Sequence, residues 1–165
     1  MPDTRLQVTL REVQDGDLDE FFAQLRDPHA AALAGDTFEA PNERQAFDAH
    51  WRHLRRAEGV LVRTIEVVED TGHRVAGHIR NHPGSEEHLV SFWIDRAYWG
   101  RGVTTSALGQ FLDELGQRPV YARVPRHNEA AIVVLRRNGF LPVSEETGYS
   151  PERGRMVDEV VLRHG

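Results

Sequence analysis

Residues 88–115, HLVSFWIDRAYWGRGVTTSALGQFLDEL, decide the fold because they predict a strand, a glycine-bearing loop and a helix in succession. Residues 89–94 are largely apolar on both faces, which is typical of a central strand covered on both sides. Gly100 and Gly102 then allow the backbone to turn sharply. Apolar side chains recur at helical spacing from there to Leu115. The segment therefore predicts a tight loop that joins a buried strand to an amphipathic helix.

This loop predicts an anion site. Free N–H groups and the positive end of the helix dipole point at the same place, and the usual occupant is a phosphate. A dinucleotide-binding fingerprint does not fit, because Thr105 stands where its third glycine is required. A nucleoside-triphosphate loop does not fit either, because the chain contains no Gly-Lys pair.

Two segments carry a resemblance to a known family. Residues 93–105, WIDRAYWGRGVTT, resemble the acyl-CoA loop of the GNAT N-acetyltransferase superfamily, and most closely its ribosomal-protein N-acetyltransferase (Rim-like) branch. The branch pattern is W-[LI]-D-x-x-Y-W-G-[KR]-G-[IVY]-A-T, and only Thr104 departs from it, in place of alanine. Residues 128–140 are similar to N-x-x-S-x-x-[VL]-[LM]-x-[KR]-x-G-F, with Ala131 in place of the serine. The resemblance covers roughly Leu6 to Leu162.

The resemblance implies a mixed α/β fold with a central, mostly antiparallel sheet of about seven strands flanked by about four helices. It implies one acyl-CoA N-acyltransferase domain over residues 1–165, with acetyl-CoA as cosubstrate. The pantetheine arm would lie between two splayed strands, near residues 92–94 and 120–124. The residues implied to bind the cosubstrate are Phe92, Trp93, Ile94, Gly100, Arg101, Gly102, Val103, Thr104 and Asn128. Trp93 fits a core position as well, and Asn128 also suits a helix N-cap.

The rest of the chain predicts further strands and helices around this centre. The expected strands are 6–13, 60–69, 73–80, 119–124, 140–143 and 156–162. The expected helices begin near Asp17, at Asn42 as N-cap, and at Asn128, with Gly139 just past the end of the last. Residues 81–85 predict a turn, and residues 144–155 predict a loop or ragged hairpin.

Direct acetyl transfer needs a group that removes the amine proton, a donor to the oxyanion and a proton for the leaving thiolate. The branch often has a glutamate at the position of Leu89, and other members of the superfamily a tyrosine at the position of Leu135. The candidates nearby are Ser91, His88, Glu87, His78 and His82, and of these we select Ser91, His88 and His82. Histidine titrates near neutrality and can act as a base directly or through water. The alternatives are solvated histidines, a serine packed under the cosubstrate, and an amine that arrives partly deprotonated.

Composition excludes several classes of protein. The 165 residues include no cysteine, which rules out disulfides and a thiol nucleophile. The His50/His53 spacing lacks the further ligands that zinc needs, and the His78/His82 pair falls on an expected strand and turn rather than a helix, so we predict no metal. A net charge of −6 disfavours nucleic-acid binding. No apolar run approaches the ~20 residues of a membrane span, and residues 1–13 lack a signal-peptide core. The expected location is cytoplasmic, with no membrane partner.

The acceptor is expected to be a primary amine, either a protein or peptide N-terminus or a small molecule. A homodimer is implied only by the frequency of dimers in the superfamily. One alternative is an acyl-CoA-binding sensor or scaffold without turnover, which Leu89 and Leu135 favour. Another is an acyltransferase that uses succinyl-CoA, which a roomier pocket with a basic residue would mark.

Overall fold

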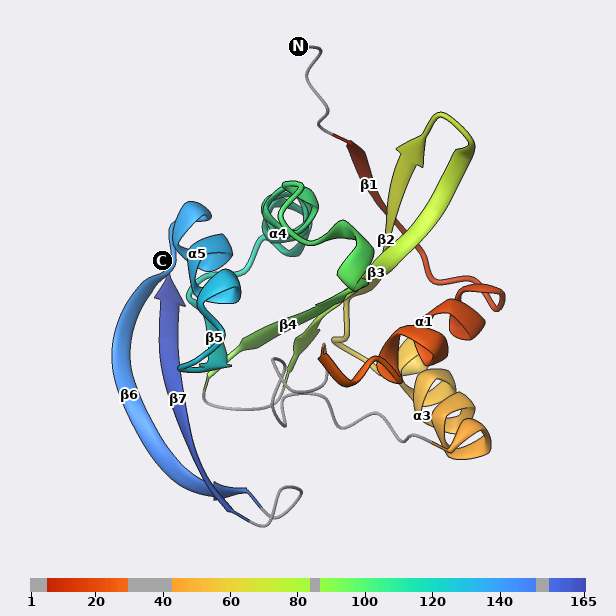
Figure 1. The fold of residues 1–165 in the computed structure, drawn as a ribbon. Helices are drawn as coiled ribbons and strands as arrows, with labels where there is room; N and C mark the ends of the chain where they lie inside the picture. Colours follow the sequence, from red (N-terminus) through yellow and green to blue (C-terminus); the bar gives the residue numbers. More distant parts are fainter. Residues whose placement is uncertain (1–5, 30–42, 84–86, 151–154) are drawn as a thin grey trace.

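A seven-stranded sheet with helices on both faces forms the centre of the computed structural model, which describes residues 6–29, 43–83, 87–150 and 155–165 (Figure 1). The strand order is β1-β2-β3-β4-β5-β7-β6, and all neighbours are antiparallel except the parallel pair β4 and β5. The elements are β1 (Gln7–Arg11), α1 (Asp17–Leu25), α3 (Arg44–Arg56), β2 (Val62–Glu69), β3 (Gly72–His82), β4 (Leu89–Ile94), the short 3₁₀ helix η1 (Arg96–Tyr98), α4 (Val103–Leu115), β5 (Val120–Pro125), α5 (Glu129–Arg137), β6 (Leu141–Ser150) and β7 (Arg155–His164). This mixed sheet confirms the predicted fold class.

The helices form two layers, with α4 and α5 over one face of the sheet and α1 and α3 over the other (Figure 1). The larger core lies beneath α4 and α5, where Leu108 and Phe111 are fully buried against the sheet. A second core lies beneath α1 and α3 and contains Phe21, Phe47 and Trp51. Burial of such side chains is the main force that fixes each layer on the sheet.

The ends of α5 match the signals in the sequence. The side chain of Asn128 accepts a hydrogen bond from the N–H of Ala131 at 3.2 Å, as expected for an N-cap. Gly139 has a φ of +88°, and the N–H of Phe140 donates to the carbonyl of Leu135 at 3.0 Å. This Schellman arrangement ends the helix and directs the chain into β6.

One predicted helix start is wrong. The N-cap of α3 is Glu43, whose carboxylate accepts hydrogen bonds from the N–H groups of Gln45 and Ala46. A carboxylate at this position also complements the helix dipole. Asn42, the predicted N-cap, lies outside the described residues.

Of the two alternatives predicted for residues 144–155, the hairpin is confirmed in the described residues, because β6 continues through residues 144–150 and pairs with β7 along this length. The side chains of 144–149 are exposed, so these residues show no apolar alternation, and the pairing depends on the backbone. The turn predicted at residues 81–85 is wrong in part. Asn81 and His82, predicted to begin a turn, are the last residues of β3, while residues 84–86 lie outside the described part.

His78 on β3 is buried beneath α1 and α3. Its ring centroid lies 4.7 Å from those of Phe21 and Trp51, in edge-on contact with both. Burial lowers the pKa of His78 to about 3, and the nearby charge of Arg80 acts in the same direction. The imidazole is therefore neutral in the folded protein at neutral pH, whereas it titrates near 6.5 in an unfolded chain.

We expect the stability of the protein to fall as the pH drops below 6.5, in part because of His78. Below pH 6.5 the imidazole of His78 binds a proton in the unfolded chain but not in the folded protein, so the free energy of unfolding decreases with acidification. For one such histidine, the loss between pH 7.5 and pH 5.0 is about 2 kcal/mol. Urea unfolding measures how far the free energy of unfolding falls between pH 7.5 and pH 5.0. This fall should be about 2 kcal/mol smaller in His78→Leu than in the wild type. An unchanged difference would contradict this role of His78.

Candidate active site

β4 and β5 diverge in the middle of the sheet. Among the described residues, Leu89 and Tyr121 are the only paired positions between them, and the N–H of Tyr121 donates to the carbonyl of His88 at 2.9 Å. Beyond this point the strands separate, so backbone groups of residues 90–94 and 122–125 face each other without ladder hydrogen bonds. This geometry confirms that two central strands splay, and it leaves N–H and C=O groups for an extended, amide-rich ligand.

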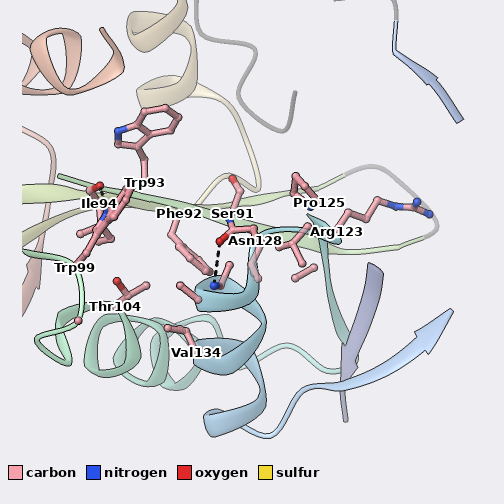
Figure 2. A pocket seen from close by; sticks show the side chains of 16 residues that line it. Ser91, Phe92, Trp93, Ile94, Trp99, Thr104, Arg123, Pro125, Asn128 and Val134 are labelled. Atoms are coloured by element: carbon pink, nitrogen blue, oxygen red, sulfur yellow. Dashed lines mark hydrogen bonds between the residues drawn. The ribbon is translucent and has the colours of Figure 1, made fainter. Parts of the chain in front are cut away.

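A pocket of about 160 Å³ occupies this gap (Figure 2). Its lining is mostly apolar and comes from β4, β5, the loop before α4, α4 and α5. Six of the nine predicted cosubstrate-binding residues line it, namely Phe92, Trp93, Ile94, Gly100, Thr104 and Asn128. The candidate Ser91 also lines it. The structure thus gathers residues from distant parts of the chain around one cavity.

The glycine loop between η1 and α4 has the backbone geometry that an anion site needs. Gly100 and Gly102 have φ values of +71° and +79°, a region that side chains rarely adopt. Gly102 precedes α4 directly and provides no side-chain cap, so the first N–H groups of the helix remain for a ligand. A Cβ atom added at either glycine would meet no atom within 4 Å, which shows that the loop borders open space.

The other predicted loop residues lie beside the pocket rather than in its lining. Val103 is 1% exposed and anchors the start of α4 in the larger core. Arg101 is exposed, and its guanidinium lies 5.7 Å from the centroid of the Tyr98 ring. Stacking of this kind holds the cation at the edge of the loop. Val103 therefore supports the loop, and Arg101 provides a positive charge near it.

Trp99 is a lining residue to which the sequence analysis assigned no role. Its indole N–H donates to the carbonyl of Ile94 at 3.0 Å, which ties the loop to the end of β4. The quoted family pattern includes this tryptophan, so the signal was present in the sequence. Its contact with β4 shows that it positions the loop.

Side chains of β4 point to opposite faces of the sheet. Figure 2 shows Phe92 directed toward α5, whereas Ser91 and Trp93 extend to the face covered by α1 and α3. Trp93 is 5% exposed and lies opposite His78 in the β3–β4 register. The pocket is therefore bordered by different side chains on its two sides, which we call the helix α5 face and the Ser91 face.

Ser91 and His82, two of the three candidate acid–base residues, are in direct contact. The hydroxyl oxygen of Ser91 lies 2.6 Å from Nε2 of His82. Burial lowers the pKa of His82 to about 4, and the charges of Arg80 and His88 contribute in the same direction. The imidazole is therefore neutral at neutral pH and can accept a proton from the serine hydroxyl.

His88, the third candidate, does not line the pocket. Its Nε2 lies 2.9 Å from the side-chain nitrogen of Asn81, and its Nδ1 is in contact with the side-chain amide of Gln117. Side-chain amides therefore contact both ring nitrogens of His88. His88 therefore joins the end of β3, the start of β4 and the segment after α4.

A charged cluster lies at one rim of the pocket. Arg123 on β5 is a lining residue, and its guanidinium pairs with Glu87 at 2.8 Å and with Glu146 on β6. Figure 2 shows the Arg123 side chain directed away from Ser91 and Asn128. The cluster joins β5, β6 and the segment before β4, and its cation is already balanced by two carboxylates.

Among the described residues, no three or more histidine and carboxylate side chains gather as a metal site. No helix in the described part of the chain is long and apolar enough to cross a membrane.

Comparison with known sequences gives a family match. The sequence model of the acetyltransferase (GNAT) domain matches residues 7–141. An uncharacterized protein of Mycobacterium leprae (strain TN) is 36% identical over 81 residues, which are 49% of this chain and 22% of that protein. The chain therefore matches only about a fifth of the length of this relative.

Solved structures share the fold. A spermidine N-acetyltransferase from Vibrio cholerae, in complex with CoA and spermine, has a TM-score of 0.80 at 15% identity, over 95% of this chain and 94% of that one. RimJ of Mycobacterium smegmatis, in complex with CoA-disulfide, has a TM-score of 0.76 at 20% identity, over 96% of this chain and 83% of that one. At these identities the likeness shows the fold alone.

Proposed function

Because the chain belongs to the GNAT acetyltransferase family, we propose that it transfers an acetyl group from acetyl-CoA to a primary amine. The observation that carries this proposal is the pocket between the diverging strands β4 and β5, which ends at the glycine loop of α4. An extended strand gap next to a phosphate-type loop suits a ligand that joins a pyrophosphate to an amide-rich arm.

In this proposal the pyrophosphate binds the first turn of α4, where the N–H groups after Gly102 have no side-chain cap. The pantetheine arm then lies between β4 and β5, along the strand edges that do not face β3 and β7. Asn128 and Phe92 would border the arm from the helix α5 face of the pocket. The thioester then lies between β4 and β5, within reach of an amine that approaches from the Ser91 face.

The lining favours an uncharged acyl group. Arg123 is the only cationic side chain among the lining residues in the described part of the chain, and Glu87 and Glu146 already hold it. A succinyl group would carry a second carboxylate into an apolar pocket without a free cation, which costs free energy. The acetyl group therefore fits better than the succinyl group.

The acceptor in our proposal is a protein or peptide N-terminus or a small-molecule amine. The structure of the spermidine N-acetyltransferase with the same fold is a complex with CoA and spermine, which supports a CoA thioester as donor and an amine as acceptor.

A thiol-release assay with acetyl-CoA and a panel of peptides, polyamines and amino acids tests the activity, with mass spectrometry to identify the acetylated product. Saturable turnover with at least one amine is expected. Acetyl-CoA binding without turnover on any amine would favour the sensor alternative.

Gly102→Val is expected to weaken acetyl-CoA binding at least tenfold. A β-branched residue is strained at a φ of +79°, and its side chain would project into the open space that the pyrophosphate would occupy. Calorimetric titration of the variant with acetyl-CoA measures the effect.

Gly116→Val is the matched control, because Gly116 caps the other end of α4 at a φ of +68° and also borders open space. It should lower the melting temperature by a similar amount and leave the affinity for acetyl-CoA unchanged. Equal loss of affinity for acetyl-CoA in both variants would contradict the proposal that the glycine loop binds the pyrophosphate.

A further inference from the structure

We propose that Ser91 and His82 form a proton relay on the Ser91 face of the pocket, in which the serine hydroxyl takes the proton of the attacking amine and passes its own proton to the imidazole. The inference rests on the acetyl transfer proposed above and deepens it. It assigns separate roles to the candidate acid–base residues: Ser91 touches the substrate, His82 acts through Ser91, and His88 supports the backbone.

The relay depends on the register of two adjacent strands. Ser91 lies opposite Arg80, and His82 lies opposite Leu89, so the serine and the imidazole are diagonal neighbours on one face of the β3–β4 pair. Their contact of 2.6 Å between Oγ and Nε2 is a short hydrogen bond. Ser91 lines the pocket and His82 does not, so the serine is the member of the pair that a substrate can reach.

The surroundings of His82 keep its nitrogen available. Arg80 on the same strand and His88 at the start of β4 both oppose a positive charge on the imidazole. The carboxylate of Glu87, just before β4, is paired with Arg123 of β5. Burial and these charges hold the pKa of His82 near 4, so the Nδ1–H tautomer can accept from Ser91 through Nε2 at neutral pH.

The steps balance without any further reactant. The amine nitrogen attacks the thioester carbonyl, a C–N bond forms, and the nitrogen becomes an ammonium that is more acidic than that of the free amine. Its proton passes to Oγ of Ser91 while the hydroxyl proton moves to Nε2 of His82. The C–S bond then breaks, and the proton returns from His82 through Ser91 to the thiolate sulfur. The products are the acetylated amine and free CoA thiol.

The low proton affinity of His82 suits the second half of this sequence. A free thiol has a pKa near 8.5, whereas the imidazolium of His82 gives up its proton at a pKa of about 4. Proton return to the thiolate is therefore strongly downhill. The first half requires only that the nitrogen become a stronger acid than this imidazolium once the C–N bond has formed.

The test compares single-turnover and steady-state rates of Ser91→Ala, His82→Ala and the double variant, with the amine that the wild type acetylates best. We expect kcat to fall about 100-fold or more in each single variant, the range of general acid–base catalysis. The KM for acetyl-CoA should stay within threefold of wild type, because the pair lies on the face away from α5. The double variant should be no slower than the slower single variant, because groups that act as a unit are not additive.

Two further measurements separate a relay from structural support. Added imidazole should restore the kcat of His82→Ala at least tenfold, and Ser91→Thr should keep most of the activity because it retains a hydroxyl. His53→Gln, at an exposed histidine of α3, is the control and should behave as wild type. If Ser91→Ala and His82→Ala both keep kcat within threefold of wild type, or if imidazole restores nothing, the relay is overturned.

The experiments distinguish failure of the relay from failure of the proposed acetyl transfer. A wild type that binds acetyl-CoA but acetylates no amine overturns the transfer and the relay together. A wild type that acetylates an amine, with relay variants that do so equally well, overturns the relay alone.

Discussion

Gly77→Ala is expected to destabilise the protein severely, although the change adds only one methyl group. A Cβ atom at Gly77 on β3 would lie 1.9 Å from the carbonyl oxygen of Trp93 and 2.9 Å from its carbonyl carbon. Both atoms belong to the backbone of β4, so no flexible side chain can move aside. The strands would have to separate where they hold Trp93 and Ser91. We expect a loss of about 4 kcal/mol or more, which is a large part of the stability of an ordinary domain.

The close approach lies beside an irregularity of the sheet. The β2–β3 register shifts between Ile65 and Glu66, so that Ile65 pairs with Gly77 and Glu66 with Val75. The N–H of Asp95 donates to the carbonyl of Ala76 at 2.7 Å, and this hydrogen bond also joins β3 to the residue that follows β4. Gly148→Ala on β6 is the control, because a Cβ atom there meets nothing within 4 Å. Urea unfolding measures both variants, and a Gly77→Ala protein within 1 kcal/mol of wild type would show that the strands are not held this tightly.

Asp17→Asn is expected to destabilise the protein by about 3 kcal/mol, the lower end of the range for breaking a buried ion pair. Asp17 is 4% exposed at the start of α1 and receives two hydrogen bonds of 2.8 Å from the guanidinium of Arg11. Thr64 on β2 donates to it at 2.7 Å, and the N–H of Gln14 at 2.8 Å. The residue therefore ties α1 to β1 and β2, and an amide cannot accept all four hydrogen bonds.

The pKa of Asp17 gives the sign of its pH dependence. Burial opposes ionisation, but the hydrogen bonds from Arg11 and the other donors outweigh it and hold the pKa below its usual value. The stabilisation is therefore present above the pKa of an unfolded aspartate and is lost as the pH falls through the folded pKa.

Asp19→Asn is the matched control for Asp17→Asn, because Asp19 is also in the first turn of α1. Its ion pair with Arg44 is largely exposed and contributes little. Equal unfolding free energies for the two variants would contradict a special role for Asp17.

The centre of the fold was predictable because its sequence signals are local. The strand at 89–94, the loop glycines and the helix to Leu115 each depend on neighbouring residues, and the structure places all three as expected. The caps of α5 at Asn128 and Gly139 were predictable for the same reason. In these segments the apolar pattern and the turn chemistry favour the same structure.

The features that the sequence predicted only loosely or wrongly have a different origin. The second half of β6 carries no apolar alternation, so only its pairing with β7 defines it as a strand. The end of β3 contains Asn81, which resembles a turn residue, but its side chain accepts from the N–H of Leu61 and holds the strand in place. Sequence patterns do not contain such long-range backbone contacts.

The candidate site was predictable in composition but not in geometry. The family pattern identified the loop and Asn128, whereas the contact between Ser91 and His82 depends on the β3–β4 register. The sequence offered Ser91, His82 and His88 as equivalent candidates. The structure distinguishes them, because Asn81 and Gln117 occupy both nitrogens of His88.

The most direct test of the account is a calorimetric titration of the wild-type protein with acetyl-CoA, with ATP and NAD as comparisons. The account predicts saturable binding of acetyl-CoA at one site and no saturable binding of ATP or NAD, because the loop matches neither nucleotide pattern. Absence of acetyl-CoA binding, or preference for ATP or NAD, would contradict the assignment of the β4–β5 pocket as an acyl-CoA site.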